Sequence, residues 1–366
     1  MRKRASFLAV LVLMLVMLAG CTGTPAEPPE PPVSPAPKVA KIGLGHLTSI
    51  SKSTDLKVGE DGNPVPPAGQ VDTVITAVAF DADGRVVQVA IDTSQSKVAF
   101  DKDLGLATDV SVLGETKVEM KDRYGMKRVS TIQKEWFEQA RELEKWMIGK
   151  TVAEIKAMKT MERDPSHPHV PDVPELTSLV TITVQDYLAA VEEAYNNAVA
   201  VPEGGAKFGL GHVISLSSSK GYANVNGTET LPLAQVNTTL AATLFDTDGK
   251  VVATILDTCQ TKVTYDKDGK VTNRTADLKS KKELGEAYGM KRASTIGKEW
   301  FEQAEELEKW MAGKTVSHIR DMKLTAGGDH PGVPDVAELK SLVTMTVGDY
   351  IAAVEESYAN AKSVIQ

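Results

Sequence analysis

The sequence has very few cysteines and aromatic residues, and it has no excess of positive charge. Its 366 residues include only two cysteines, too few for a framework of several disulfides. Aromatic residues make up 5% of the chain, which argues against a carbohydrate-binding surface of stacked rings. The formal net charge is −8, which argues against a nucleic-acid-binding protein because few cations would neutralise phosphates. Beyond the first 20 residues, no run is apolar enough to span a bilayer.

The N-terminus has the features of a bacterial export signal. Arg2–Arg4 form a basic start, and Phe7–Leu18 form an apolar run too short for a comfortable membrane span. Leu18–Cys21 is similar to the lipobox of bacterial lipoproteins. This resemblance implies that residues 1–20 are a signal peptide, removed before a lipidated Cys21. We therefore expect lipid anchoring on the extracytoplasmic face of a bacterial membrane, with the membrane as a partner through Cys21.

After this start the chain consists of a tether and two repeats. Residues 21–40 are rich in proline, alanine and glutamate, which predicts an extended linker. From Lys41 the sequence repeats with a spacing of about 165 residues, too long for a solenoid unit. We therefore predict two tandem homologous domains, residues 41–200 and 201–366, joined by a short flexible link.

Each repeat has the pattern of an α+β fold, a small antiparallel sheet packed with helices. Alternating apolar residues on both sides of an Asp-Gly turn predict a hairpin. Helical spacing predicts an amphipathic helix before the closing part of each repeat. The predicted strands of the first repeat are 73–80, 86–91 and 97–100, and its predicted helices are 135–149, 151–158 and 187–198.

A threonine-containing stretch precedes the last helix of each repeat. Thr183 lies three residues before Asp186, which is the spacing of a capping box, so we predict that the helix starts there. Thr181 would then lie just ahead of the helix N-terminus, where free N–H groups favour an anion. Thr344 and Thr346 occupy the same places in the second repeat. The pattern predicts a phosphate-friendly site beside a hydroxyl.

The residues around these threonines resemble a known signature. The bacterial FMN-binding domain family carries Asp-x-x-Ser-Gly-Ala-Thr-x-Thr before a helix, and Glu175–Thr183 and Glu338–Thr346 align with it in register. The resemblance implies an FMN cofactor attached by a flavin transferase to Thr181 and Thr344. By the same resemblance, the other cofactor-binding candidates are Ser178, Ser341, Thr183 and Thr346. Leu-Val replaces Gly-Ala in both copies, so the resemblance favours the domain fold over covalent attachment.

Two histidines come next as possible ligand contacts. His46 and His212 each close a Gly-Leu-Gly-His stretch, for which we favour a bent strand start over a phosphate loop. No set of residues has zinc-like spacing, so the sequence predicts no metal site. Cys259 lies in a strand-like run, and we interpret it as a packed thiol.

Together these features predict a lipid-anchored protein whose two domains relay electrons between redox partner proteins through flavin. An electron carrier or binding protein is favoured over an enzyme that turns over a substrate. The alternatives that remain open are a non-redox surface protein that binds a small ligand or partner protein, and a mainly structural envelope protein.

Overall fold

The computed structural model describes residues 38–327 and 331–364. The predicted signal peptide, Cys21 and most of the predicted linker therefore lie outside the described residues. The chain from residue 36 onward forms one compact unit. Within the described ranges, no helix combines the length and apolar character needed to cross a membrane. The fold combines helices with antiparallel sheets, which confirms the α+β prediction.

The first repeat is built on a four-stranded sheet in the order β5-β4-β1-β8. Its strands are β1 (Lys41–Ser49), β4 (Ala68–Phe80), β5 (Val86–Ala99) and β8 (Val199–Ala200). The predicted hairpin is confirmed, since β4 and β5 pair from Ala68↔Ala99 to Phe80↔Val86. The separate strand predicted at 97–100 is wrong, because β5 continues unbroken to Ala99. The predicted flexible link begins as β8, which pairs with β1.

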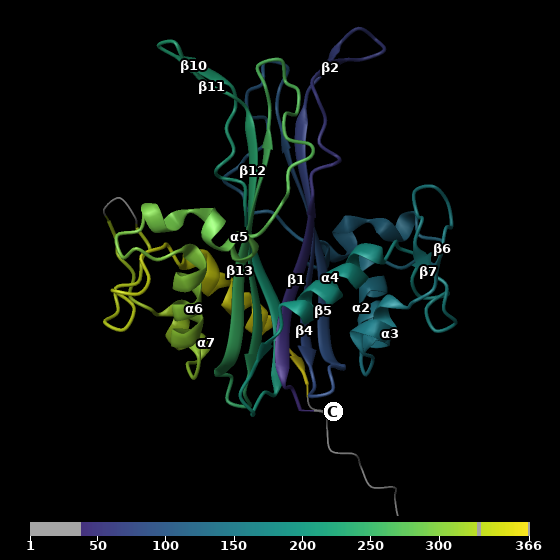
Figure 1. The fold of residues 1–366 in the computed structure, drawn as a ribbon. Helices are drawn as coiled ribbons and strands as arrows, with labels where there is room; N and C mark the ends of the chain where they lie inside the picture. The colour runs from purple at the N-terminus through teal and green to yellow at the C-terminus, as the bar shows by residue number, and fades with distance from the viewer. Residues whose placement is uncertain (1–37, 328–330, 365–366) are drawn as a thin grey trace, which may run out of the picture. The chain divides into compact units, whose positions relative to one another are not determined.

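The second repeat has the matching sheet order β13-β12-β9-β14. Its strands are β9 (Lys207–Ser215), β12 (Leu233–Phe245), β13 (Val251–Thr264) and β14 (Lys362–Ser363). Separate two-stranded sheets are formed by β2 (Lys57–Val58) with β3 (Pro64–Val65), by β6 (Thr160–Met161) with β7 (Val170–Pro171), and by β10 (Ala223–Val225) with β11 (Thr228–Thr230). The hairpins β2–β3 and β10–β11 project at one end of the sheets (Figure 1).

Helices cover one face of each sheet (Figure 1). The first repeat has α1 (Lys117–Met120), α2 (Trp136–Met147), α3 (Val152–Lys156) and α4 (Gln185–Asn196). The second repeat has α5 (Lys281–Leu284), α6 (Trp300–Met311), α7 (Val316–Arg320) and α8 (Gly348–Ala359). Short 3-10 turns follow α1 and α5: η1 (Lys121–Tyr124), η2 (Met126–Arg128), η3 (Gly285–Tyr288) and η4 (Met290–Arg292). The three longer helices predicted in the first repeat are present, with bounds shifted by a few residues.

The start of α4 differs from its prediction. The N-cap residue is Val184, in a helical backbone conformation, and no side chain caps the helix. The predicted capping box of Thr183 and Asp186 is therefore wrong. In α8 the N-cap is Val347, also without a side-chain cap, so the box predicted for Thr346 and Asp349 is wrong too. Both threonine hydroxyls are left for other contacts.

The Gly-Leu-Gly-His stretch is a regular strand, and the predicted bent start is wrong. Strand β1 pairs with β4 without a register shift over its whole length. Its glycines allow α4 to lie directly on the strand. A Cβ at Gly43 would be 1.9 Å from the carbonyl oxygen of Ala194, and one at Gly45 would be 2.0 Å from that of Ala190. The glycines therefore serve helix–strand packing.

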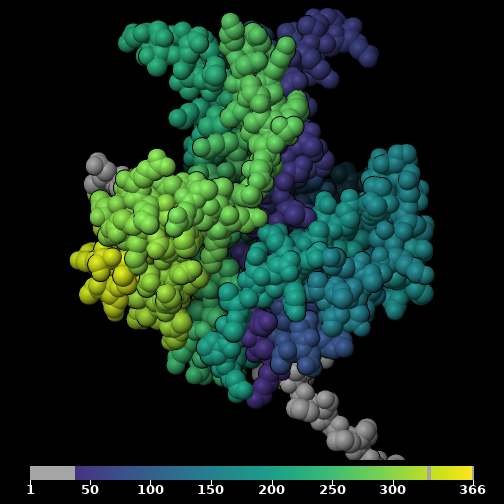
Figure 2. Space-filling model, viewed as in Figure 1, coloured from purple at the N-terminus to yellow at the C-terminus, as the bar shows by residue number. Residues whose placement is uncertain are grey.

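The two sheets pack against each other through the faces that their helices leave free. Two hydrophobic clusters hold the interface, and each contains buried residues of both repeats. One of them joins Ile42 and Ile75 to Phe208 and Leu240. The repeats also meet along the middle of the molecule in the space-filling view (Figure 2). The layers therefore follow the order helices, sheet, sheet, helices. The division of the chain into two domains near residue 200 stays a prediction.

Candidate functional site

The two threonines expected to carry FMN are both hydrogen-bonded to a helix side chain; Thr181 is buried and Thr344 is half-buried. Thr181 is 7% exposed. Its backbone N–H and its hydroxyl both donate to Oε1 of the buried Gln139, at 2.8 and 3.2 Å. Thr344 makes the same pair of bonds to Gln303, at 2.8 and 3.3 Å. Val180 beside Thr181 is fully buried. Both hydroxyls are thus occupied in holding the chain to the helix beneath it.

The other residues of the signature fall into different surroundings. Ser178 and Ser341 are exposed. The Thr346 hydroxyl donates to the carbonyl oxygen of Pro331 at 3.3 Å. Thr183 is different, because its Oγ1 is buried and has no hydrogen-bond partner among the described residues. A buried hydroxyl without a partner costs free energy, which a ligand or water contact would recover.

Thr183 lines a cavity of about 600 Å³ in the first repeat. This volume lies in the range of small-molecule sites, about 300–1,000 Å³. Its lining comes from β5, the α1–α2 region and the chain before α4, and includes Gln95, Lys117, Tyr124, Trp136, Thr183 and Tyr187. Aromatic walls with a few convergent polar groups are typical of cofactor sites. The cavity is therefore our candidate ligand site of the first repeat.

Lys117 gives this cavity a buried positive charge. The residue is 9% exposed, and its ammonium lies 5.0 Å from the ring centre of Tyr124 and 5.2 Å from that of Trp136. Within the described ranges, it has no hydrogen-bond or ion-pair partner. Burial lowers the pKa of Lys117 to about 8, so the amine is still mostly charged at neutral pH. The charges of Asp72 and Asp92 raise the pKa of Lys117, but neither carboxylate forms an ion pair with it among the described residues, so the ammonium is available to an anionic ligand.

The second repeat preserves the cation and its rings. The Lys281 ammonium lies 5.1 Å from the ring centre of Tyr288 and 5.3 Å from that of Trp300. Trp300 donates through Nε1 to the hydroxyl of Tyr350 at 3.0 Å, as Trp136 donates to Tyr187 at 3.2 Å. The arrangement is thus a property of the repeat rather than of one copy.

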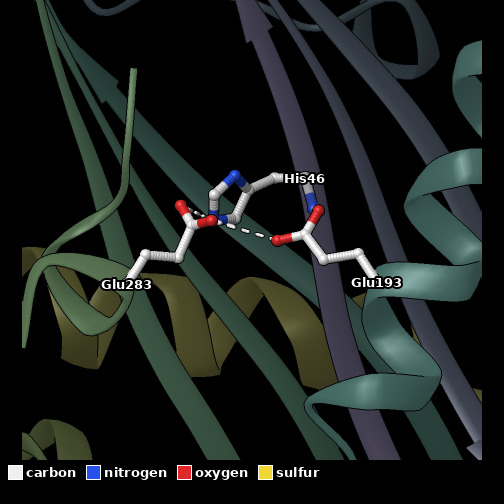
Figure 3. Close-up of side chains that lie close together, drawn as sticks. All are labelled: His46, Glu193 and Glu283. Carbon is white, nitrogen blue, oxygen red and sulfur yellow. Dashed lines mark hydrogen bonds and ion pairs between the residues drawn. The ribbon is translucent and has the colours of Figure 1, made fainter. Parts of the chain in front are cut away.

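His46 lies apart from this cavity, in a cluster of carboxylates between the repeats. It shares a strand face with Ile42 and Leu44, which points toward the second sheet. Its Nε2 is 3.9 Å from Glu193 Oε1, 3.8 Å from Asp257 Oδ2 and 3.7 Å from Glu283 Oε2. Figure 3 shows His46 between Glu193 on α4 and Glu283 on α5. The second repeat therefore contributes part of the first repeat's cluster.

His212 occupies the corresponding place in the second repeat, with a different arrangement. Its Nε2 is 3.6 Å from Asp92 Oδ2 and 4.0 Å from Glu119 Oε2. Its Nδ1 instead faces Glu356 Oε2, at 3.4 Å. The carboxylates are thus divided between the two ring nitrogens, whereas all three face one nitrogen in the His46 cluster.

Burial and neighbouring charges act against each other in these clusters. Burial lowers the pKa of His212, but Asp92, Glu356 and Glu119 outweigh it and raise the pKa above its ordinary value. Burial raises the pKa of Glu193, and the Glu283 and Asp257 charges act in the same direction. The imidazoles are therefore held close to negative charge that they only partly neutralise.

The sequence pointed to the histidines but not to their partners. Asp257 and Glu283 lie more than 200 positions from His46, so no local spacing could reveal the cluster. The signal that was present is the repeat itself. Each histidine is surrounded by three carboxylates at equivalent positions, drawn from both repeats. They are Asp92, Glu119 and Glu356 around His212, and Asp257, Glu283 and Glu193 around His46.

Comparison with known proteins gives little further information. No protein-family description matches the chain, and no solved structure matches it. The chain is 33% identical over 100 residues to a chlorophenol reductase of Desulfitobacterium hafniense. That match covers 24% of this chain and 30% of the reductase, so the chain spans less than a third of that protein. The family stays open.

Proposed function

We propose that this chain is a lipid-anchored extracytoplasmic protein that binds FMN without a covalent bond and relays electrons between partner proteins. The site is the cavity of the first repeat lined by Lys117, Tyr124 and Thr183. The observation that carries the proposal is the buried Lys117 ammonium, which has aromatic neighbours and forms no ion pair or hydrogen bond with any residue that the structure describes. The membrane anchor rests on the sequence around Cys21.

The residues of the cavity fit the chemical groups of a flavin. Its about 600 Å³ and its aromatic lining suit a planar heterocycle. Lys117 offers a positive charge to the anionic part of the ligand. The unpartnered Thr183 hydroxyl offers a hydrogen bond. When bound, the flavin supplies one- or two-electron transfer, while the protein supplies position and electrostatics.

The same structure argues for non-covalent binding. The Thr181 hydroxyl is buried and bonded to Gln139, so a flavin transferase could reach it only after that segment opened. In the second repeat, Thr344 is bonded to Gln303 in the same way. We therefore expect mass spectrometry to find no flavin adduct on Thr181 or Thr344, even after co-expression with a flavin transferase.

A binding titration tests the proposal. Purified protein is mixed with FMN, and quenching of flavin fluorescence reports binding. Lys117→Met removes the buried cation, and we expect binding about 10–100-fold weaker, because a charged hydrogen bond contributes about 1.5–3 kcal/mol. Lys145→Met removes an exposed charge from α2 and is the matched control. FMN that stays unquenched by the wild-type protein, or that binds both variants equally, would refute the proposal.

A further inference from the structure

A cluster of charged side chains surrounds the buried His46 and is separate from the proposed flavin cavity. Three carboxylate oxygens lie within 4 Å of one imidazole nitrogen. His46 and Asp257 are both more than nine-tenths buried. Even with a protonated imidazole, three ionised carboxylates leave two negative charges without compensation. Uncompensated buried charge is costly, so the cluster calls for a cation.

One carboxylate oxygen of the cluster, Glu193 Oε1, accepts no hydrogen bond from the described residues. Glu193 accepts the backbone N–H of His46 through Oε2, at 2.9 Å. Its Oε1 is buried and has no hydrogen-bond partner among the described residues, although it lies 3.9 Å from His46 Nε2. This distance is too long for a hydrogen bond. An acceptor that faces a buried imidazole across such a gap has room for an ion between them.

The distances fit a small tetrahedral cation. Zinc binds nitrogen and oxygen ligands at about 2.0–2.2 Å, which places tetrahedral ligand atoms about 3.3 Å from one another. The three Nε2-to-oxygen distances are 3.7, 3.8 and 3.9 Å, so each need shorten by only a few tenths of an ångström. Imidazole with carboxylates is a donor set that zinc accepts.

A route to the cluster is also present. Asp257 and Glu283 line a cavity of about 300 Å³ that is bordered by α5 and α6 residues. An ion can therefore reach two of the carboxylates without passing through the hydrophobic interface of the sheets. Ser280 fixes Asp257 by donating its hydroxyl to Oδ2 at 2.7 Å, which orients that carboxylate toward the cluster.

We propose that His46, Glu193 and Glu283 bind one zinc ion that links the two repeats, since one ligand atom of each lies within 4.8 Å of the other two. Three protein ligands leave the fourth tetrahedral position for water or for Asp257, whose Oδ2 lies 3.8 Å from His46 Nε2. The His212 cluster is not assigned an ion, because its nearest carboxylates face different ring nitrogens: Glu356 faces Nδ1, whereas Asp92 and Glu119 face Nε2.

The two clusters provide a matched pair of variants. Glu283 and Glu119 are both the third helical residue of a capping box, and each bonds back to the N-cap residue. Glutamine also satisfies a capping box. Glu283→Gln and Glu119→Gln therefore make the same chemical change at equivalent positions, one inside and one outside the proposed site. Glu193→Gln is a second variant within the site that retains an acceptor for the His46 N–H.

The experiment loads the purified protein with zinc chloride, desalts it, and measures metal by mass spectrometry. We expect about one zinc ion per chain in wild type and in Glu119→Gln, and close to none in Glu283→Gln and Glu193→Gln. Added zinc should raise the melting temperature only of the first two proteins. Circular dichroism before loading shows whether each variant is folded.

Three results would overturn the assignment. The first is a wild-type protein that holds no zinc after desalting. The second is a folded variant of the His46 cluster that holds as much zinc as the wild type. The third is a Glu119→Gln protein that loses as much zinc as Glu283→Gln. Each of these is independent of FMN binding, which is measured by flavin fluorescence in the absence of zinc.

Discussion

Replacing Gly45 by alanine tests how closely α4 packs on β1. The added methyl carbon would be 2.0 Å from the carbonyl oxygen of Ala190 and 2.7 Å from the backbone nitrogen of Ala194. Non-bonded heavy atoms prefer about 3.5 Å or more, so α4 would have to move by about 1.5 Å. Both obstacles are backbone atoms of a helix, so no side chain can rotate to make room. The helix must therefore leave the strand or the strand must deform.

The cost follows from what that movement breaks. Ala190 and Val191 are fully buried residues of α4, and a shift of this size would loosen their packing. It would also stretch the 2.9 Å bond from the His46 N–H to Glu193 beyond hydrogen-bond length. Overpacked cores lose about 1–3 kcal/mol or more. We expect the melting temperature to fall by roughly 1.5–4.5 °C, because the unfolding entropy of a unit this large is about 0.7 kcal/mol/K.

Differential scanning calorimetry of Gly45→Ala measures this fall, with Gly348→Ala as the control. Gly348 is the first residue of α8, and a Cβ there would meet nothing within 4 Å. We expect the free energy of unfolding of the control to be unchanged or higher by up to about 1 kcal/mol, because alanine restricts the backbone of the unfolded chain more than glycine does. A Gly45→Ala protein that melts with the wild type would refute the packing argument.

Two further predictions concern the contact between the repeats. Leu240→Ala removes a fully buried side chain from the cluster shared by both sheets. We expect one unfolding transition for both repeats, with a free energy of unfolding lower by about 2–5 kcal/mol. Two calorimetric transitions, only one of them shifted, would show that the repeats unfold separately. Lys362→Met leaves the buried Glu144 carboxylate without the ammonium that lies 2.6 Å from its Oε2. Burial already raises the pKa of Glu144, so its contribution to stability is highest at low pH and is lost as pH rises through the folded-state pKa. Urea unfolding should therefore show a loss of about 1–3 kcal/mol at pH 8 and a smaller one at pH 5, whereas equal losses would contradict the reasoning.

The sequence determined the local elements of each repeat. Alternation on both sides of Asp81–Gly84 was enough to predict the hairpin, because a strand exposes its two faces in turn. The spacing of Trp136, Leu143 and Met147 was enough to predict α2, because a helix buries one stripe. The repeat itself was visible in the conserved order of these motifs between the two halves of the chain.

Only the tertiary structure decided what the chemically active residues contact. Thr181 was expected beside an anion site, yet its hydroxyl bonds to Gln139 on a helix more than 40 positions earlier. The glycines before His46 were expected to bend a strand, but they admit a helix against it. His46 meets Asp257 and Glu283 because two sheets from separate repeats pack face to face. Local spacing carries no information about such contacts, since burial and distance arise only when the layers assemble.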